Sequence, residues 1–129
     1  ARDDQVVGPA GLGAEVVPGV SLVADAVGLA EACRANDLVI TGEGTYDHTS
    51  RTGKVVHGVA TVAAATARPC IALAGRVTVG AREMRAMGVE SAYAAVDLVG
   101  EEQSLARPYE ALAALAERVA RTWSPGESA

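Results

Sequence analysis

The sequence predicts an α/β fold in which a parallel sheet is flanked by helices, and three observations lead to that prediction. Short apolar runs typical of strands alternate along the chain with segments of helical spacing. Half of the 129 residues are hydrophobic, which is enough for the core of one domain. The chain has no Phe and only three Tyr and one Trp, so small aliphatic side chains must build that core. Alternating elements of this kind favour a parallel sheet covered by helices.

The first half of the chain predicts a helix, a strand and a second helix. Residues 20–33 keep apolar side chains on one face of a 3.6-residue period, and Gly28 should divide this helix in two. The β-branched run DLVI, residues 37–40, predicts a strand that ends at Gly42. A long loop should follow, because helical spacing resumes only at Lys54.

The second half repeats the pattern. Pro69 precedes the apolar run CIALAG, which predicts a second strand. A helix over about residues 81–86 should end at Gly88, and the run around residues 92–96 predicts a third strand. Three strands make a small sheet, so at least one of its edges should need a partner.

The last helix is expected from about Ser104 to Thr122, with Pro108 tolerated because it falls in the first turn. Pro125 and Gly126 should stop it. We expect its apolar face to consist of Leu105, Tyr109, Leu112, Ala116, Val119 and Trp123.

Composition excludes several classes of function. The net charge is −5 and the 11 basic residues are scattered, which argues against a nucleic-acid partner. Cys33 and Cys70 lie too far apart for a paired zinc motif, and we expect reduced thiols in the cytoplasm. No leader-like start and no apolar stretch of roughly 20 residues occurs, so we expect neither secretion nor a membrane span.

Candidate chemistry is concentrated in residues 41–54, TGEGTYDHTSRTGK, which follow the first predicted strand. Ligands of such sheets bind at the carboxyl ends of the strands. Two glycines let the backbone approach a ligand, two carboxylates suit Mg²⁺ or a substrate hydroxyl, and one cation suits a phosphate. These residues are Gly42 and Gly44, Glu43 and Asp47, and Lys54. They are the components of phosphoryl transfer, although Val55 after Gly53 and Lys54 excludes a Walker A loop.

From the residues alone, a purely structural interpretation is equally open. Gly42 and Gly44 would then be turn glycines, and Asp47 would cap a turn or helix. Lys54 would be an exposed residue at the start of a helix.

A longer pattern favours the functional interpretation. From Pro18 to Trp123 the chain contains, in order, PGVSLVADAVGL, DLVITGEGTYD, RTGK, GVA and IALAG. This set resembles the carboxyl-terminal part of type 1 glycerate kinases, whose loop typically reads ITGEGRxD before GK and GVA. The matching positions are Thr41, Gly42, Glu43, Gly44, Asp47, Gly53, Lys54, Gly58, Val59 and Ala60. The chain departs from the pattern at Thr45, where the family usually has Arg, and at Thr49 and Ser50, where it usually has Gln and Thr.

The resemblance implies a flavodoxin-like (Rossmann-like), three-layer portion of a larger two-domain kinase. Residues 1–19 would be the remnant of a Gly-rich loop, residues 20–124 the α/β domain, and residues 125–129 a tail. The implied reaction is transfer of the γ-phosphoryl group of ATP, with Mg²⁺, to D-glycerate or a related hydroxy acid. The product 2-phosphoglycerate is favoured over 3-phosphoglycerate.

The resemblance also suggests roles for individual residues. Asp47, Lys54 and Glu43 would be catalytic, and Glu43 and Asp47 would hold Mg²⁺. The expected substrate- or phosphate-binding residues are Thr41, Gly42, Gly44, Gly53, Ser50 and Arg76.

These kinases are normally much longer than this chain. The amino-terminal part of the kinase, or a second chain, would therefore be needed to complete the sheet and the site. The chain alone would then be inactive. The alternative is a catalytically silent α/β module that retains a loop for phosphate or nucleotide.

Overall fold

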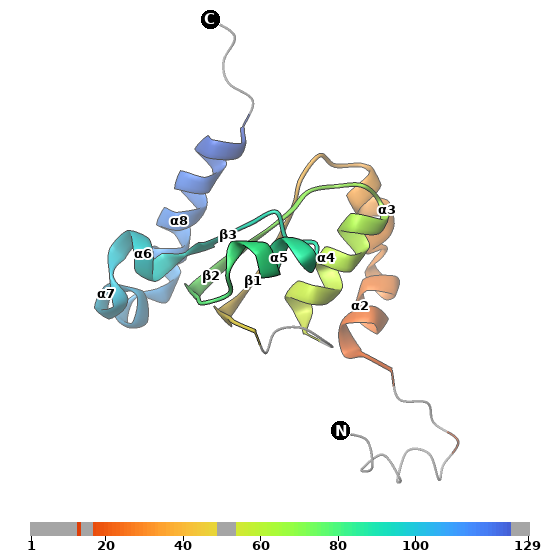
Figure 1. Cartoon of the computed structure of the whole chain (residues 1–129), viewed down its shortest axis with the longest axis horizontal. Coiled ribbons are helices and arrows are strands. Elements are labelled where there is room, and N and C mark those ends of the chain that lie inside the picture. Colours follow the sequence, from red (N-terminus) through yellow and green to blue (C-terminus); the bar gives the residue numbers. More distant parts are fainter. Residues whose placement is uncertain (1–12, 14–16, 49–53, 125–129) are drawn as a thin grey trace, which may run out of the picture.

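The computed structural model describes Gly13 and residues 17–48 and 54–124. In this part of the chain, seven helices and three strands alternate as an α/β fold, which confirms the predicted fold class (Figure 1). The elements are α2 (Gly19–Val27), α3 (Leu29–Arg34), β1 (Val39–Tyr46), α4 (Val55–Ala65), β2 (Cys70–Val77), α5 (Ala81–Ala86), β3 (Ser91–Ala94), α6 (Ala95–Val99), α7 (Glu101–Ala106) and α8 (Pro108–Trp123).

The three strands form one parallel sheet in the order β1-β2-β3. The β1–β2 pairing runs from Val39 opposite Cys70 to Tyr46 opposite Val77. Strand β3 is shorter and pairs with β2 between Ser91 and Ala94. Among the described residues, β1 has a strand neighbour on one side only, so its other side is a free edge of the sheet.

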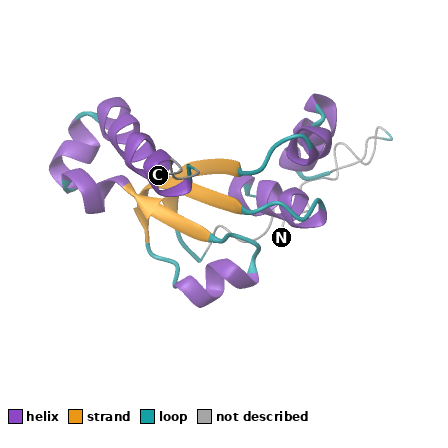
Figure 2. Cartoon of the chain, turned by 90° about the horizontal axis from the view of Figure 1, so that it is seen from above, coloured by secondary structure: helices purple, strands orange, loops and turns teal. Residues whose placement is uncertain are grey.

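Side-chain alternation along β2 gives the sheet two apolar faces. Cys70, Ala72 and Ala74 belong to a first core, which lies beneath α4. Ile71 packs with Ala95 and α8 in a second core on the opposite side of the sheet. Figures 1 and 2 show α2, α3 and α4 gathered on one side of the strands and α6, α7 and α8 on the other. The result is a three-layer arrangement, as the predicted fold class requires.

Both crossover helices lie on the same face. Helix α4 joins β1 to β2 and contributes Val56, Ala60 and Ala63 to the first core. Helix α5 joins β2 to β3 and contributes Met84 to the same core. The chain then crosses to the other face only after β3, through α6, α7 and α8.

Two predicted breaks in the helices are confirmed. Gly28, with φ +72°, ends α2 and separates it from α3, as a left-handed residue does. Gly88, with φ +92°, follows α5. Farther on, Arg68 fixes the end of α3, because its guanidinium donates hydrogen bonds to the carbonyls of Cys33, Arg34 and Asn36 at 2.7–3.1 Å.

Strand β1 is longer than the sequence predicted. The expected strand ended at Gly42 and passed into a long loop, but β1 continues to Tyr46. All residues of the segment TGEGTY except Gly44 have a partner on β2, and this pairing outweighs the turn tendency of its two glycines. The first four residues of the expected loop, 43–46, are therefore strand, and the connection begins at Asp47.

The last part of the chain also differs from its prediction. The run expected to be a third strand over residues 92–96 changes to helix at Ala95. The single expected last helix is two helices, α7 and α8, because Pro108 starts a new helix after Arg107.

The predicted apolar face of the last helix is largely wrong. Leu105, Tyr109, Leu112 and Ala116 are exposed, and of the expected face only Val119 and Trp123 pack against the second core. The residues of α8 buried against the sheet are instead Ala111, Leu115 and Val119. Trp123 also donates its indole N–H to the Tyr93 hydroxyl at 2.8 Å.

No helix in the described part of the chain is long and apolar enough to cross a membrane. The domain boundary expected at residue 19 and the start of the expected tail lie where the described residues begin and end. Residues 125–129, and residues 1–19 apart from Gly13 and 17–19, lie outside the described residues.

Candidate functional site

The predicted site residues are placed by strand β1 and by the start of α4. Thr41, Gly42, Glu43 and Gly44 lie within β1, and Asp47 follows its last residue. Because α4 is the crossover helix from β1, its first residues lie at the same end of the sheet, as Figure 1 shows. Ser50 and Gly53 are outside the described residues.

Gly42 is required by the packing of the two strands. A Cβ atom at this position would lie 2.3 Å from the Leu73 carbonyl oxygen of β2, which is far inside van der Waals contact. The interpretation of Gly42 as a turn glycine is therefore wrong, because Gly42 lies within β1 and close packing of the two strands requires a glycine there.

Gly44 has different surroundings. A Cβ atom at Gly44 would meet nothing within 4 Å among the described residues. Its carbonyl oxygen is nevertheless close to β2, since a Cβ atom on Gly75 would lie 2.8 Å from it. Packing therefore does not explain the glycine at residue 44, and the space beside it is open.

Glu43 is a partly buried carboxylate on β1. Its Oε1 atom is buried and has no hydrogen-bond partner among the described residues. Desolvating a carboxylate oxygen without a partner is costly, so such an atom is typical of a site completed by another group.

Tyr46 lies three residues after Glu43 and is almost completely buried. Its hydroxyl also has no hydrogen-bond partner in the part of the chain that the structure describes. Burial raises the pKa of the Tyr46 hydroxyl above its ordinary value, and the nearby Cys70 thiol and Glu43 carboxylate raise it further. Tyr46 therefore stays protonated and can donate. Sequence reasoning missed this residue, because the predicted strand ended at Gly42 and left Tyr46 in a loop.

The residues that could hold Mg²⁺ are the two predicted carboxylates, Glu43 and Asp47. The described residues contain no group of three or more His, Cys, Asp or Glu side chains arranged around one metal position. Mg²⁺ at phosphate sites commonly uses only one or two carboxylates, and phosphate oxygens and water supply the rest. The unpartnered Oε1 of Glu43 fits this chemistry.

Lys54 occupies the N-cap position of α4, with extended backbone angles, and its side chain is exposed. It makes no side-chain capping hydrogen bond to the helix. The backbone N–H groups at the start of an 11-residue helix carry a partial positive charge that favours an anion. Lys54 and the start of α4 therefore add positive potential at the end of the sheet where β1 ends.

Arg76 lies on β2 directly opposite Thr45 in the strand register. Its Nη2 atom donates a hydrogen bond to Glu101 Oε1 of α7 at 2.8 Å. The structure thus places Arg76 at the expected end of the sheet, but pairs it with a carboxylate of the protein.

An apolar groove adjoins the other side of β1, with a volume of about 620 Å³. Its floor is formed by strand residues, and α7 and α8 form its wall through Leu105, Pro108 and Leu112. Sequence reasoning assigned Leu105 and Leu112 to the core and so missed the groove. Ala111, Leu115 and Val119 also recur at helical spacing, although Ala111 is small. This second apolar set was the signal that the buried face of the helix lay elsewhere.

Taken together, the described site contains two carboxylates, a protonated phenol, a lysine and a helix N-terminus near the end of one strand. Carboxylates can orient a cation or accept a proton, and the positive groups can stabilise an anion. This arrangement suits transfer or binding of a phosphate.

Comparisons with known proteins agree with this chemistry. Residues 7–124 match the model of the glycerate kinase family. Glycerate 2-kinase of Escherichia coli is 32% identical over 116 residues, covering 89% of this chain and 30% of that protein. Glycerate kinase of Halalkalibacterium halodurans is 38% identical over 85 residues, covering 66% of this chain and 22% of that protein. The chain thus spans less than a third of the length of these curated relatives.

Proposed function

This chain belongs to the glycerate kinase family, and from that premise we propose that it supplies the carboxyl-terminal part of an ATP-dependent kinase acting on D-glycerate. The product would be a phosphoglycerate, with 2-phosphoglycerate favoured over 3-phosphoglycerate. A cytoplasmic location is part of the proposal, in keeping with the two free, buried thiols. The observation that carries the proposal is the buried Oε1 atom of Glu43, which has no hydrogen-bond partner among the described residues and lies on the strand that leads to Asp47 and Lys54.

Glu43 and Asp47 would position Mg²⁺ or accept the proton of the attacking glycerate hydroxyl. Mg²⁺ would neutralise charge between the β and γ phosphates of ATP when bound. Glu43 sits on a paired strand, so its carboxylate is held by a rigid element. The proposal assigns these two roles to Glu43 and Asp47 as a pair.

Lys54 would stabilise negative charge on the transferring phosphoryl group, aided by the N–H groups at the start of α4. Thr41, Gly42, Gly44, Ser50 and Gly53 would line the path of the phosphates or the substrate. The openness beside Gly44 supports such an approach at that residue.

Arg76 would bind the glycerate carboxylate. This role requires it to exchange Glu101 for the substrate, since the two side chains form an exposed ion pair. Exposed pairs of this kind contribute little free energy, so the exchange costs little. Arg76 also lies opposite Thr45, the position at which the family pattern usually has a cation.

The proposal can be tested with a chimera in which residues 7–124 replace the matching part of the E. coli glycerate 2-kinase. We expect glycerate-dependent ADP production from Mg·ATP by the chimera and none by the 129-residue chain alone. Lys54→Met in the chimera should lower kcat by about 10²–10³. Arg118→Met, which removes a cation from the far end of α8, is the matched control and should leave kcat unchanged.

The second candidate is a catalytically silent α/β module that retains a loop for phosphate or nucleotide. Thr45 in place of the family Arg favours it, because a cation is lost. A folded chimera that binds Mg·ATP but produces no glycerate-dependent ADP would support this module and contradict the kinase proposal.

A further inference from the structure

Strand β1 carries two buried polar atoms that have no hydrogen-bond partner among the described residues. They are Oε1 of Glu43 and the hydroxyl oxygen of Tyr46. A buried polar atom without a partner costs free energy, because it has given up its hydrogen bonds to water. Two such atoms on one strand therefore need an explanation.

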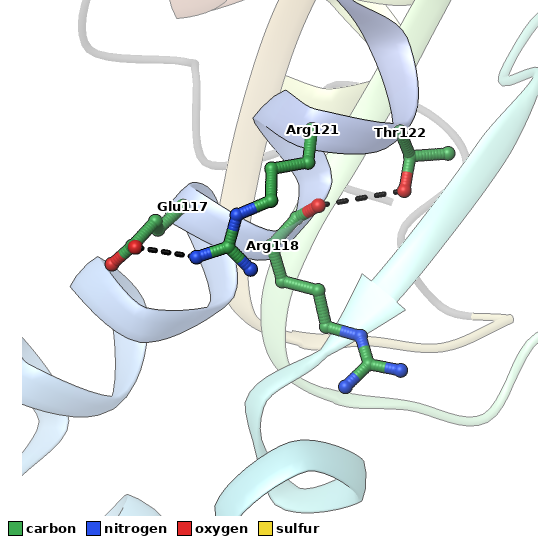
Figure 3. A network of polar contacts seen from close by, with 4 residues as sticks. All are labelled: Glu117, Arg118, Arg121 and Thr122. Atoms are coloured by element: carbon green, nitrogen blue, oxygen red, sulfur yellow. Dashed lines mark hydrogen bonds and ion pairs between the residues drawn. The ribbon is translucent and has the colours of Figure 1, made fainter.

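Exposed polar side chains at the end of α8 differ from these two. Arg121 donates to Glu117 at 2.6 Å (Figure 3). The Thr122 hydroxyl donates to the Arg118 carbonyl in the same network. Water could replace the partners of these exposed side chains at little cost. The two atoms on β1 have no such substitute, since both are removed from solvent.

The register of the sheet puts both side chains on the same face. Glu43 lies opposite Ala74, and residues opposite each other in a parallel pair point to the same side of the sheet. Ala74 belongs to the first core, beneath α4. Tyr46 is the last residue of β1, belongs to that core as well and is 1% exposed. The carboxylate and the phenol therefore both lie on the α4 side of the strand.

The two groups also interact electrostatically and are chemically complementary. After burial and the Cys70 thiol, the Glu43 carboxylate is a further cause of the raised pKa of the Tyr46 hydroxyl. An ionised carboxylate only accepts hydrogen bonds, whereas a protonated phenol donates one. Each group thus offers what the other lacks.

We propose that Tyr46 is a positioning residue of the candidate site, whose hydroxyl donates a hydrogen bond to the Glu43 carboxylate and holds it in one orientation. Hydrogen bonds with a charged acceptor are stronger than those between neutral groups. A carboxylate has about four acceptor positions on its two oxygens, so positions remain for Mg²⁺ or for a substrate proton. The hydrogen bond does not depend on the proposed function, whereas its effect on catalysis rests on it.

A double-mutant cycle in the 129-residue chain, followed by urea unfolding, tests the hydrogen bond. Tyr46→Phe removes only the hydroxyl, and Glu43→Met removes the charge and the acceptor oxygens at similar length. Tyr46→Phe should raise the equilibrium constant for unfolding about tenfold in the unchanged chain, because it leaves a buried carboxylate without its donor. In the Glu43→Met background the same substitution should not destabilise the chain, because the hydroxyl that it removes has no partner there.

Two matched controls show whether this coupling is specific. Tyr93→Phe removes a hydroxyl on the opposite face of the sheet and should act equally with and without Glu43→Met. Glu117→Met removes the exposed carboxylate that pairs with Arg121 and should leave the effect of Tyr46→Phe unchanged. The proposal would be overturned by an equal effect of Tyr46→Phe with and without Glu43→Met. Stabilisation of the unchanged chain by Tyr46→Phe would overturn it too.

Kinetics of the chimera described above test the positioning role separately. Tyr46→Phe should lower kcat about tenfold and change the KM for glycerate less than about twofold, because the buried phenol would act only through Glu43. Tyr93→Phe should leave both constants unchanged. Full kcat of Tyr46→Phe in an active chimera would overturn the positioning role.

The two experiments also separate this proposal from the proposed function. Coupling in the double-mutant cycle without ADP production by the folded chimera would retain the hydrogen bond and reject the kinase function. ADP production together with an additive cycle would do the reverse.

Discussion

Gly42 and Gly44 lie two residues apart on β1, yet only one of them is explained by the fold. At Gly42 the carbonyl of Leu73 fills the space that a Cβ atom would need. At Gly44 that space is open on the side where the proposed ligand would lie. Strand packing thus explains the glycine at residue 42, and ligand access is the role that we propose for the glycine at residue 44.

We therefore expect Gly42→Ala to lower the free energy of unfolding of the chain by roughly 2–3 kcal/mol, because a backbone carbonyl cannot move aside cheaply. Gly44→Ala, the matched control, should change it by less than about 0.5 kcal/mol. Urea unfolding followed by circular dichroism measures both values. Equal effects of the two substitutions would contradict the close approach of β1 to β2 at Gly42.

Cys70 provides a test that depends on pH. Burial raises the pKa of its thiol from 9.0 to about 11, and the neighbouring Cys33 adds to the shift. The unfolded chain releases this proton at lower pH than the folded chain. The contribution of the protonated thiol to stability is therefore fully present below about pH 9 and is lost as pH rises toward 11. The raised pKa of Tyr46 acts in the same direction at higher pH.

The free energy of unfolding should therefore fall by about 2 kcal/mol between pH 9 and pH 11, since each pKa unit corresponds to about 1.4 kcal/mol. Cys70→Ala should lower the overall stability but flatten this decline. The comparison uses the slope of stability against pH, so the cavity left by the substitution does not matter. Equal slopes for the unchanged chain and for Cys70→Ala would show that the Cys70 thiol ionises equally in the folded and unfolded states.

At the level of elements, two leucines of α8 lie in different surroundings, one in the core and one at the groove. Leu115 is 3% exposed and packs with Ile71 and Val119 beneath the sheet. Leu112 lies one turn earlier and faces the groove. Leu115 therefore belongs to the core of this chain, and Leu112 lines the groove.

In the isolated chain, Leu115→Ala should cost about 2–4 kcal/mol of stability, because it leaves a cavity in the second core. Leu112→Ala should cost less than about 1 kcal/mol, since its side chain is already half exposed. Thermal and urea unfolding can measure both. A larger loss at Leu112 would mean that the originally predicted apolar face is the buried one.

Local patterns in the sequence were enough to predict the alternation of elements, the break at Gly28 and the end of α5 before Gly88. They failed where a distant strand decides the local structure. The glycines of TGEGTY favour a turn, but pairing with β2 holds them extended. Leu105, Tyr109 and Leu112 satisfied a helical period, but the period alone could not reveal that α8 turns a different face, with Ala111, Leu115 and Val119, toward the sheet.

For the candidate site, the sequence could predict which segment the residues occupy, and their roles stay predictions. Motif spacing identified Glu43, Asp47 and Lys54, and the structure places them near the end of β1 and the start of α4. It could not reveal the buried hydroxyl of Tyr46 or the pairing of Arg76 with Glu101, because both depend on contacts between separate elements. Ser50 and Gly53 lie outside the described residues.

At the scale of the whole molecule, the three-stranded sheet has one covered face and one face that is open over β1. The proposed site lies at the carboxyl end of the same strand. The open part of the sheet and the proposed site therefore adjoin the same strand.

The central claim is that the end of β1 carries the chemistry, and steady-state kinetics of Asp47→Asn in the chimera test it most directly. Asn keeps the size of the side chain but removes its charge and its ability to accept a proton. We expect glycerate-dependent kcat to fall by about 10²–10⁴ with an unchanged melting temperature, whereas Asp97→Asn on α6, the matched control, should leave kcat unaltered. If Asp47→Asn retained full kcat, the chemistry would have to lie elsewhere, and the assignment of this strand end as the catalytic site would be wrong.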